Sequence, residues 1–185
     1  NNGLKLLGSG KSSSLIAPIK MSDFTVKTLL ESKSQYGFAG IAVGYANDYV
    51  FLGRYDGKIV AAHVTDGDLA VYDSVDDRAG NVTLQLEKVG GVYKAIIVDD
   101  GSYIVVADNI YANYSKVDAM LVAEDCEAQF GYLSFGDDID GKEGFAAFRR
   151  EGNLDFGLSG TNSDYRYRFF GGNWKYVIGG IEQTD

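Results

Sequence analysis

The residues of this chain best suited to binding chemistry are tyrosines that stand among short polar side chains. One segment carries Asp108, Asn109, Tyr111, Asn113 and Tyr114. Sugar recognition needs aromatic faces that stack on C–H groups and planar polar groups that bind hydroxyls. We therefore expect a polar, aromatic loop over residues 108–114. In this loop Tyr111 and Tyr114 stack on sugar rings, and the two asparagines and the aspartate bind hydroxyl groups.

Two other places combine aromatic and polar residues in the same way. The tip of an expected hairpin, followed closely by Arg54, carries Tyr45, Asn47, Asp48 and Tyr49. Near the C-terminal end, Trp174 follows a Gly-Gly turn. Both are predicted carbohydrate-binding positions, although Tyr and Trp also fill the cores of β-sandwiches.

A group of acidic residues suggests a divalent cation. The segment contains Asp137, Asp138, Asp140 and Glu143, together with a glycine turn. Calcium takes six to eight oxygen ligands at flexible geometry, which a loop of carboxylates and carbonyls supplies. The twelve-residue spacing of an EF-hand is absent. A possible Ca²⁺ site is the prediction, and a solvated acidic turn is the alternative.

Catalytic patterns are weak in comparison. No run matches the alternating acidic strand E-x-D-x-x-E of sandwich glycanases, so glycoside hydrolysis stays a minor alternative. His63 is the only histidine and lies in an alternating run, where a structural role is the more common one. Cys126 is the only cysteine, which excludes an internal disulfide. We expect a protein that is not an enzyme.

Alternation of apolar and polar residues predicts the strands that position these residues. Residues 82–88 place apolar side chains on one face and polar ones on the other, as a strand with one buried face requires. Gly90-Gly91 and Asp100-Gly101 supply the positive φ angles of tight hairpin turns. We therefore predict an antiparallel meander made of residues 82–88, 92–98 and 102–107.

The same pattern continues along the chain, with further Asp-Gly turns at Asp56-Gly57 and Asp66-Gly67. Further strands are predicted at residues 23–30, 36–45, 49–54, 58–64, 68–72, 116–122, 127–135, 144–150, 165–170 and 174–178. Residues 1–7 are predicted to form an edge strand, and residues 8–14 a loop. So many antiparallel strands hide their edges in two packed sheets or a barrel. The prediction is an all-β, two-sheet antiparallel jelly-roll β-sandwich in a single domain, residues 1–185.

The composition and net charge limit the kinds of molecule that this protein is expected to bind. The 185 residues include 24 Gly and one Pro, and the net charge is −9. A surface of that sign repels nucleic acid, and no basic stripe offsets it. No run reaches the ~18 apolar residues that a membrane span needs. Because the sequence starts at Asn1, we expect a processed product or a domain of a larger protein.

Three sequence segments resemble a known family. They are 36–54, with its "AGIAV" strand and "NDYVFLG" hairpin, 82–93, and the pair 129–134 with 146–148. Together they resemble the concanavalin A-like β-sandwich modules found at the C-terminus of β-xylosidase-type glycoside hydrolases and in laminin G-like domains. The resemblance covers about residues 21–148, whereas the aromatic, Gly-rich extension 155–185 departs from the pattern.

The resemblance implies a jelly-roll sandwich that binds carbohydrate or packs beside a domain that does. We expect a non-catalytic, lectin-like carbohydrate-binding module, outside the cell or on a cell or virion surface, whose partner is a glycan or polysaccharide. One alternative is a structural or adhesive module of a surface or virion assembly, such as a fibre, which binds protein. Another is an accessory domain that buttresses a glycosidase.

Overall fold

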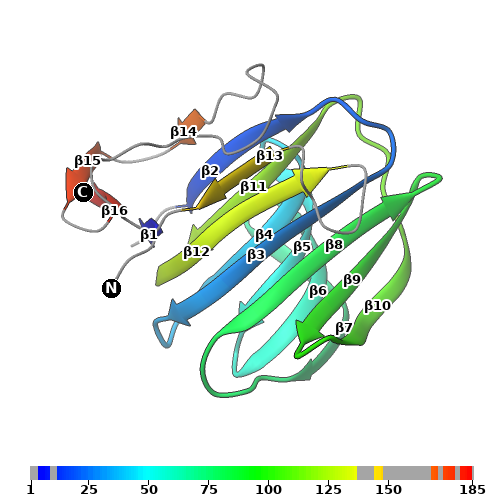
Figure 1. Cartoon of the computed structure of the whole chain (residues 1–185), viewed down its shortest axis with the longest axis horizontal. Helices are drawn as coiled ribbons and strands as arrows, with labels where there is room; N and C mark the ends of the chain where they lie inside the picture. The colour runs from blue at the N-terminus through cyan, green and yellow to red at the C-terminus, as the bar shows by residue number, and fades with distance from the viewer. Residues whose placement is uncertain are drawn as a thin grey trace.

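The computed structural model describes residues 4–8, 12–136, 144–147, 168–170, 173–177 and 180–184. In this part of the chain every regular element is a strand, and the strands form two packed sheets (Figure 1). The predicted all-β, two-sheet antiparallel sandwich is therefore confirmed. The described part contains no helix with the length and apolar character that a membrane crossing needs.

Sheet A has the strand order β10-β9-β8-β3-β12-β1-β16-β15, and β13 also pairs with β12. Its strands are β1 (Leu4–Leu7), β3 (Phe24–Lys33), β8 (Val82–Val89), β9 (Val92–Asp99), β10 (Ser102–Tyr111), β12 (Glu127–Gly136), β13 (Gly144–Ala147), β15 (Asn173–Val177) and β16 (Gly180–Thr184). Among these described strands β1 and β16 pair in parallel, and the other neighbours are antiparallel. The predicted meander is the run β8-β9-β10.

Sheet B has the order β14-β2-β11-β4-β5-β6-β7. Its strands are β2 (Ser12–Ile19), β4 (Phe38–Tyr45), β5 (Asp48–Tyr55), β6 (Lys58–Thr65), β7 (Asp68–Asp76), β11 (Val117–Glu124) and β14 (Arg168–Phe170). Consecutive hairpins build β4 to β7, whereas β11 arrives from sheet A and lies between β2 and β4.

Two predictions near the N-terminus are wrong. β2 begins at Ser12, inside the predicted loop, because its whole length pairs with β11 from Ser12↔Glu124 to Ile19↔Val117. Pairing with a buried partner strand here overrides a local sequence without alternation. The first strand is also not an edge, since β1 lies between β12 and β16.

The predicted Asp-Gly and Gly-Gly turns are confirmed. The φ angles are +49° and +71° at Asp56-Gly57, +52° and +89° at Asp66-Gly67, +48° and +80° at Asp100-Gly101, and +56° and +85° at Gly90-Gly91. Positive φ at both central residues gives the turn the twist of the flanking strands. These turns fix the strand register, and therefore which side chains face inward.

The inner faces of the sheets bury one apolar core, which includes Leu30, Leu84 and Phe130 from sheet A and Ile41 and Leu52 from sheet B. The outer face of sheet B buries a second cluster, in which the Phe38 and Phe51 rings meet edge to face, 5.1 Å between centroids. Sheet B thus packs on both faces.

Candidate functional site

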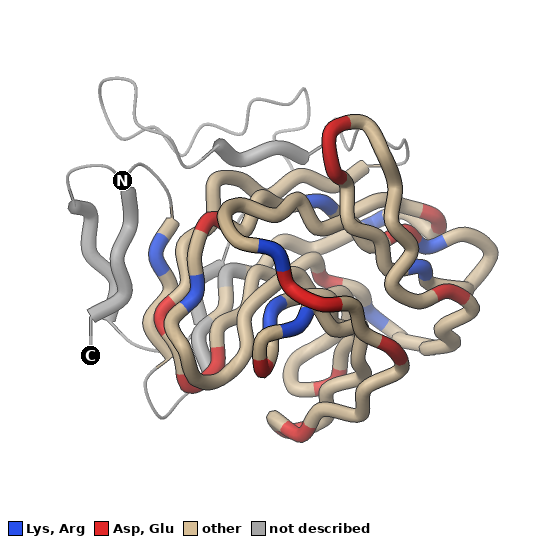
Figure 2. The backbone as a smooth tube through the Cα atoms, turned by 90° about the horizontal axis from the view of Figure 1, so that it is seen from below, with Lys and Arg blue, Asp and Glu red and all other residues tan. Residues whose placement is uncertain are grey.

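Turns at one end of the sandwich bring most of the predicted site residues near one another. This end holds the β4–β5, β6–β7 and β8–β9 turns and the connection from β10 to β11, as the strand pairings require. Acidic residues (red) lie mostly at the turns, where the backbone tube reverses, and the described Lys and Arg residues (blue) are interspersed without a basic stripe (Figure 2). Predicted residues 45, 48, 49 and 108–114 belong to this end.

A hollow at this end lies on the outer face of sheet B and is called the tip pocket below. It has a volume of about 360 Å³ and is lined by Ser14, Ile16, Tyr45, Ala46, Asn47, Tyr49, Asp66, Gly67, Asp118 and Glu124. This volume lies within the range of small-ligand sites. Two predicted residues, Tyr45 and Tyr49, therefore line one pocket together with carboxylates from β11.

Polar contacts shape the tip pocket. The Asn47 amide donates to the Asp66 carboxylate at 3.2 Å, which ties the β4–β5 turn to the β6–β7 turn. Burial raises the pKa of Tyr49 well above its ordinary value, and the nearby Glu124 carboxylate adds to the shift. The Tyr49 phenol is therefore a neutral wall of the pocket, with only 4% of the residue exposed.

Tyr45 is the more exposed of the two tyrosines that line the tip pocket. The residue is 46% exposed, and the Lys116 ammonium lies 5.7 Å from the centroid of its ring. Ala46, the next lining residue, has a φ of +54°. A left-handed conformation costs a non-glycine residue about 1 kcal/mol or more. Such strain is found preferentially at functional positions, and here it sets the direction of the hairpin tip.

Asp48, also predicted to bind sugar, contacts a different group of residues. Its carboxylate lies 2.6 Å from His63 Nε2, and the Tyr72 hydroxyl lies 3.4 Å from His63 Nδ1. Both ring nitrogens of His63 therefore have partners, in agreement with the structural role predicted for this histidine. Asp48 links β5 to β6 and does not line the tip pocket.

Tyr114 packs into the sandwich beside this group. Its ring contacts Tyr93 at 6.5 Å and His63 at 6.4 Å between centroids, and it covers one end of the core. Burial raises the pKa of Tyr114, and the Asp48 carboxylate adds to the shift. The connection from β10 to β11 therefore folds this predicted sugar-binding tyrosine inward against the core.

The predicted loop 108–114 is mostly strand. β10 continues to Tyr111 by means of a β-bulge, in which Asp108 and Asn109 together face Lys94 of β9. Asn109 has a φ of +55°, a conformation that Asn tolerates better than most residues. A shallow groove of about 250 Å³, the bulge groove, is lined by Glu87, Val89, Val92, Tyr93, Lys94, Asp108 and Asn109.

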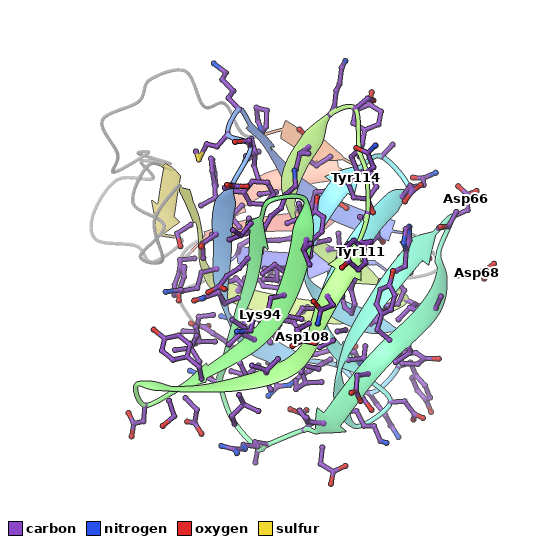
Figure 3. All side chains as sticks on the ribbon, turned by 90° about the vertical axis from the view of Figure 1, so that its right-hand side faces the viewer. Asp66, Asp68, Lys94, Asp108, Tyr111 and Tyr114 are labelled. Carbon is purple, nitrogen blue, oxygen red and sulfur yellow. The ribbon has the colours of Figure 1, made fainter. Side chains whose placement is uncertain are left out.

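Two further residues predicted in the 108–114 loop are exposed. Tyr111 is 72% exposed, and Asn113 is exposed in the connection that follows β10. Figure 3 shows Lys94 and Asp108 side by side on β9 and β10, with Tyr111 further along β10 and Asp66 and Asp68 at the β6–β7 tip. The sequence-predicted residues therefore form two surfaces and one internal cluster.

Arg54 lies at the opposite end of β5 and has structural partners. Its guanidinium binds the Asp77 carboxylate at 2.9 Å and donates to the carbonyls of Arg78 and Gly80. The residue is 9% exposed, so these contacts use a buried cation to fasten the chain after β7. Arg54 is not among the residues that line the tip pocket.

Two further predictions concern positions outside the described side chains. Trp174 lies on strand β15, and its side chain is not among those described. The acidic residues Asp137, Asp138, Asp140 and Glu143 lie outside the described residues. Within the described part, no three His, Cys, Asp or Glu side chains converge as a metal site.

Sequence reasoning missed Ser14, Asp66, Asp118 and Glu124, which line the tip pocket. Asp66 belongs to a turn that was predicted for its backbone alone. Asp118 and Glu124 stand at the two ends of β11 and share the outer face of sheet B, because Ala119, Leu121 and Ala123 face the core. Their alternation within residues 116–124 is the only signal that could have shown they share a face.

The two packed antiparallel sheets give this chain a jelly-roll β-sandwich fold of the kind found in concanavalin A-like modules, as the resemblance implied. No protein family profile matches the sequence, and no curated protein matches it. Solved structures do match the fold. The GH43 protein BlXynB of Bacillus licheniformis is 17% identical over 65% of this chain and 28% of its own, with a TM-score of 0.53.

Two other similar structures support the same fold. The xyloglucan-locus GH43B protein of Bacteroides ovatus is 13% identical over 63% of this chain and 27% of its own, with a TM-score of 0.51. The carbohydrate-binding module CBM66 of Bacillus subtilis is 16% identical over 72% of this chain and 91% of its own, with a TM-score of 0.50. The chain thus spans little more than a quarter of the GH43 proteins and most of the isolated module.

Proposed function

We propose that this domain is a non-catalytic carbohydrate-binding domain that holds a short glycan segment in the tip pocket. The tip pocket carries the proposal, because it joins an accessible tyrosine ring, an amide and carboxylates around one hollow of about 360 Å³. Stacking of Tyr45 on the apolar face of a sugar ring supplies affinity. The Asn47 amide donates hydrogen bonds to the hydroxyl oxygens of the sugar, and the Asp66 carboxylate accepts hydrogen bonds from its hydroxyl groups.

The solved structures that share the fold support this class of ligand. They include a carbohydrate-binding module and GH43 proteins, one of them from a xyloglucan locus. By analogy, the chain is one domain of a larger glycan-active protein outside the cell or on its surface. Fold alone does not establish a function, so the proposal rests on the pocket.

A glycan array with the purified domain tests the proposal, run once with calcium and once with chelator. We expect binding to glycans, and a loss of at least about tenfold in affinity, equivalent to about 1.4 kcal/mol, for Tyr45→Ala and for Asn47→Ala. Tyr55→Ala is the matched control, because Tyr55 is 40% exposed at the far end of β5. We expect this control to bind like the wild type.

The array also separates the other proposals. Binding that needs calcium and is lost in Asp138→Asn supports calcium binding by Asp137, Asp138, Asp140 and Glu143. Binding that survives chelator contradicts a required ion. Release of reducing sugar from a bound glycan would contradict the non-catalytic role. A blank array under both conditions favours an adhesive module of a surface assembly or an accessory domain beside a glycosidase.

A further inference from the structure

Strand β10 presents a row of exposed side chains on one face. Tyr103 is 53% exposed, Val105 43% and Tyr111 72%. Ile104 packs against the core and Ile110 is part of it, so the alternation of the strand turns the three exposed residues to the other side. The row therefore lies on the outer face of sheet A.

This face is opposite to the one that bears the tip pocket. On β9, Tyr93 and Ala95 belong to the inter-sheet core, which places Lys94 on the outer face of sheet A. The tip pocket opens on the outer face of sheet B. Since the two sheets pack through their inner faces, a ligand on β10 and a ligand in the tip pocket occupy opposite sides of the sandwich.

The bulge groove lies within the row, between Val105 and Tyr111. The bulge lets Asp108 and Asn109 together face Lys94, so an acid, an amide and an ammonium meet at one point of the surface. Bulges often re-aim side chains beside binding sites. Asn109 holds a positive φ there, and strained backbone persists where a site needs it.

The same bulges decide what kind of partner fits. The pairing of β10 with β9 shifts between Val105 and Ala107 and again between Ala107 and Ile110. Such breaks protect an edge strand against the addition of another strand. A second copy of this chain would also bring another net charge of −9, which opposes self-association.

Aromatic rings with hydrogen-bonding groups between them match a carbohydrate chain. Tyr103 pairs with Val98 and Tyr111 with Val92 of β9, which sets the two rings about 20 Å apart along the strand. We propose that the Tyr103–Tyr111 row and the bulge groove form a second carbohydrate-binding surface, which takes a neutral polysaccharide chain lying along β10. The ligand class rests on the proposed function, but the surface is separate from the tip pocket.

Opposite placement has a consequence for the whole domain. One molecule that binds a chain on each face cross-links two polysaccharide chains without forming a dimer. Avidity on a polymer then exceeds the affinity of either surface, whereas a short oligosaccharide reports one surface at a time. The two surfaces are therefore separable by ligand length and by mutation.

Native affinity gels that contain soluble xyloglucan, arabinoxylan or levan test the second surface. We expect at least one polymer to retard the wild type, and the double variant Tyr103→Ala, Tyr111→Ala to lose about fivefold or more in affinity for it. Tyr36→Ala is the matched control, because Tyr36 is 74% exposed between β3 and β4, at the other end of the sandwich. Equal melting temperatures of the variants show that folding is unchanged.

Cross-linking is measured with beads coated with the retarding polymer, after light scattering has established the mass of the protein. We expect the monomeric wild type to aggregate the beads, and the double variant to bind them without aggregation. Retardation that is unchanged in the double variant overturns the proposal, and so does the absence of retardation by all three polymers. Oligosaccharide binding that is lost in Tyr45→Ala and kept in the double variant tests the tip pocket separately.

Discussion

Gly40 and Gly53 face each other across β4 and β5 on the outer face of sheet B. A Cβ atom on Gly40 would overlap the Leu52 carbonyl, and one on Gly53 would overlap the Ala39 carbonyl. These glycines therefore allow neighbouring backbones to approach more closely than any side chain permits. The close pairing of β4 with β5 therefore depends on two residues that do not line the tip pocket.

Gly40→Ala should destabilise the protein by at least about 2 kcal/mol, because the clash is with backbone that cannot rotate away. Urea unfolding measures the loss. Gly131→Ala is the control, since a Cβ there would meet only the side chains of Glu31 and Leu29, at 3.1 Å. If both substitutions cost the same, the backbone contact is not what excludes a side chain at residue 40.

At the scale of elements, the connection from β7 to β8 depends on one buried cation. The chain after β7 leaves sheet B for sheet A, and Arg54 of β5 holds it through Asp77 and two carbonyls. A lysine could not replace it, because a single ammonium lacks the planar fork that reaches three partners. The far end of the sandwich is thus fixed by a side chain, whereas the end that carries the tip pocket is fixed by turns.

Arg54→Ala should cost about 3 kcal/mol, because removal of one partner leaves Asp77 partly buried without its cation. Arg54→Lys should recover less than half of that loss. The control is Arg78→Ala, whose side chain is 64% exposed in its ion pair with Asp99, and for which we expect a change within about 0.5 kcal/mol. Equal losses in the two alanine variants would show that burial of Arg54 adds nothing.

The sequence predicted those turns and strands that depend on the conformational preferences of neighbouring residues. The Asp-Gly and Gly-Gly turns and the alternating strands of the β8-β9-β10 meander follow from the conformational needs of single residues. β2 was missed as a whole, because residues 12–19 form a strand only through their pairing with β11. β10 was ended too early because its bulge carries Asp108 and Asn109, residue types that usually indicate loops.

The candidate site was predictable only as far as it lies on one hairpin. Tyr45 and Tyr49 are close in sequence and line the same pocket. Ser14 and Asp118 reach it because β2, β11 and β4 are neighbours, and nothing in the local sequence states that order. Tyrosine is a residue type that often binds sugars, but the contacts of Tyr114 with Tyr93 and His63 pack it against the core.

On the scale of the whole molecule, the groups that fix the fold are separate from the exposed tyrosines of β10. The inter-sheet core and the Arg54 network fix the fold, whereas Tyr103 and Tyr111 are exposed and lie outside that core. A net charge of −9 keeps the domain soluble and disfavours anionic ligands. Repulsion among these negative charges lowers the stability of the folded state further when more acidic groups ionise.

Alkaline pH should therefore unfold the domain through groups that the core holds neutral. Burial raises the pKa of Cys126 from 9.0 to about 11 and the pKa of Tyr93 from 10.0 to about 12. Because these values are raised in the folded state, both contributions are complete below pH 9. They are lost as the pH rises through 11 for Cys126 and 12 for Tyr93.

We expect the free energy of unfolding in urea to be nearly constant from pH 7 to 8.5 and to fall above pH 9. The share of Cys126 should be on the order of 1–2 kcal/mol by pH 11. Cys126→Ala removes the ionisable thiol and should flatten the curve between pH 9 and 11, although it lowers stability at pH 7 by removing buried volume. The buried tyrosine phenols ionise at higher pH and should continue to lower the free energy of unfolding above pH 11. If the variant keeps the wild-type slope between pH 9 and 11, the alkaline transition belongs to the tyrosines alone.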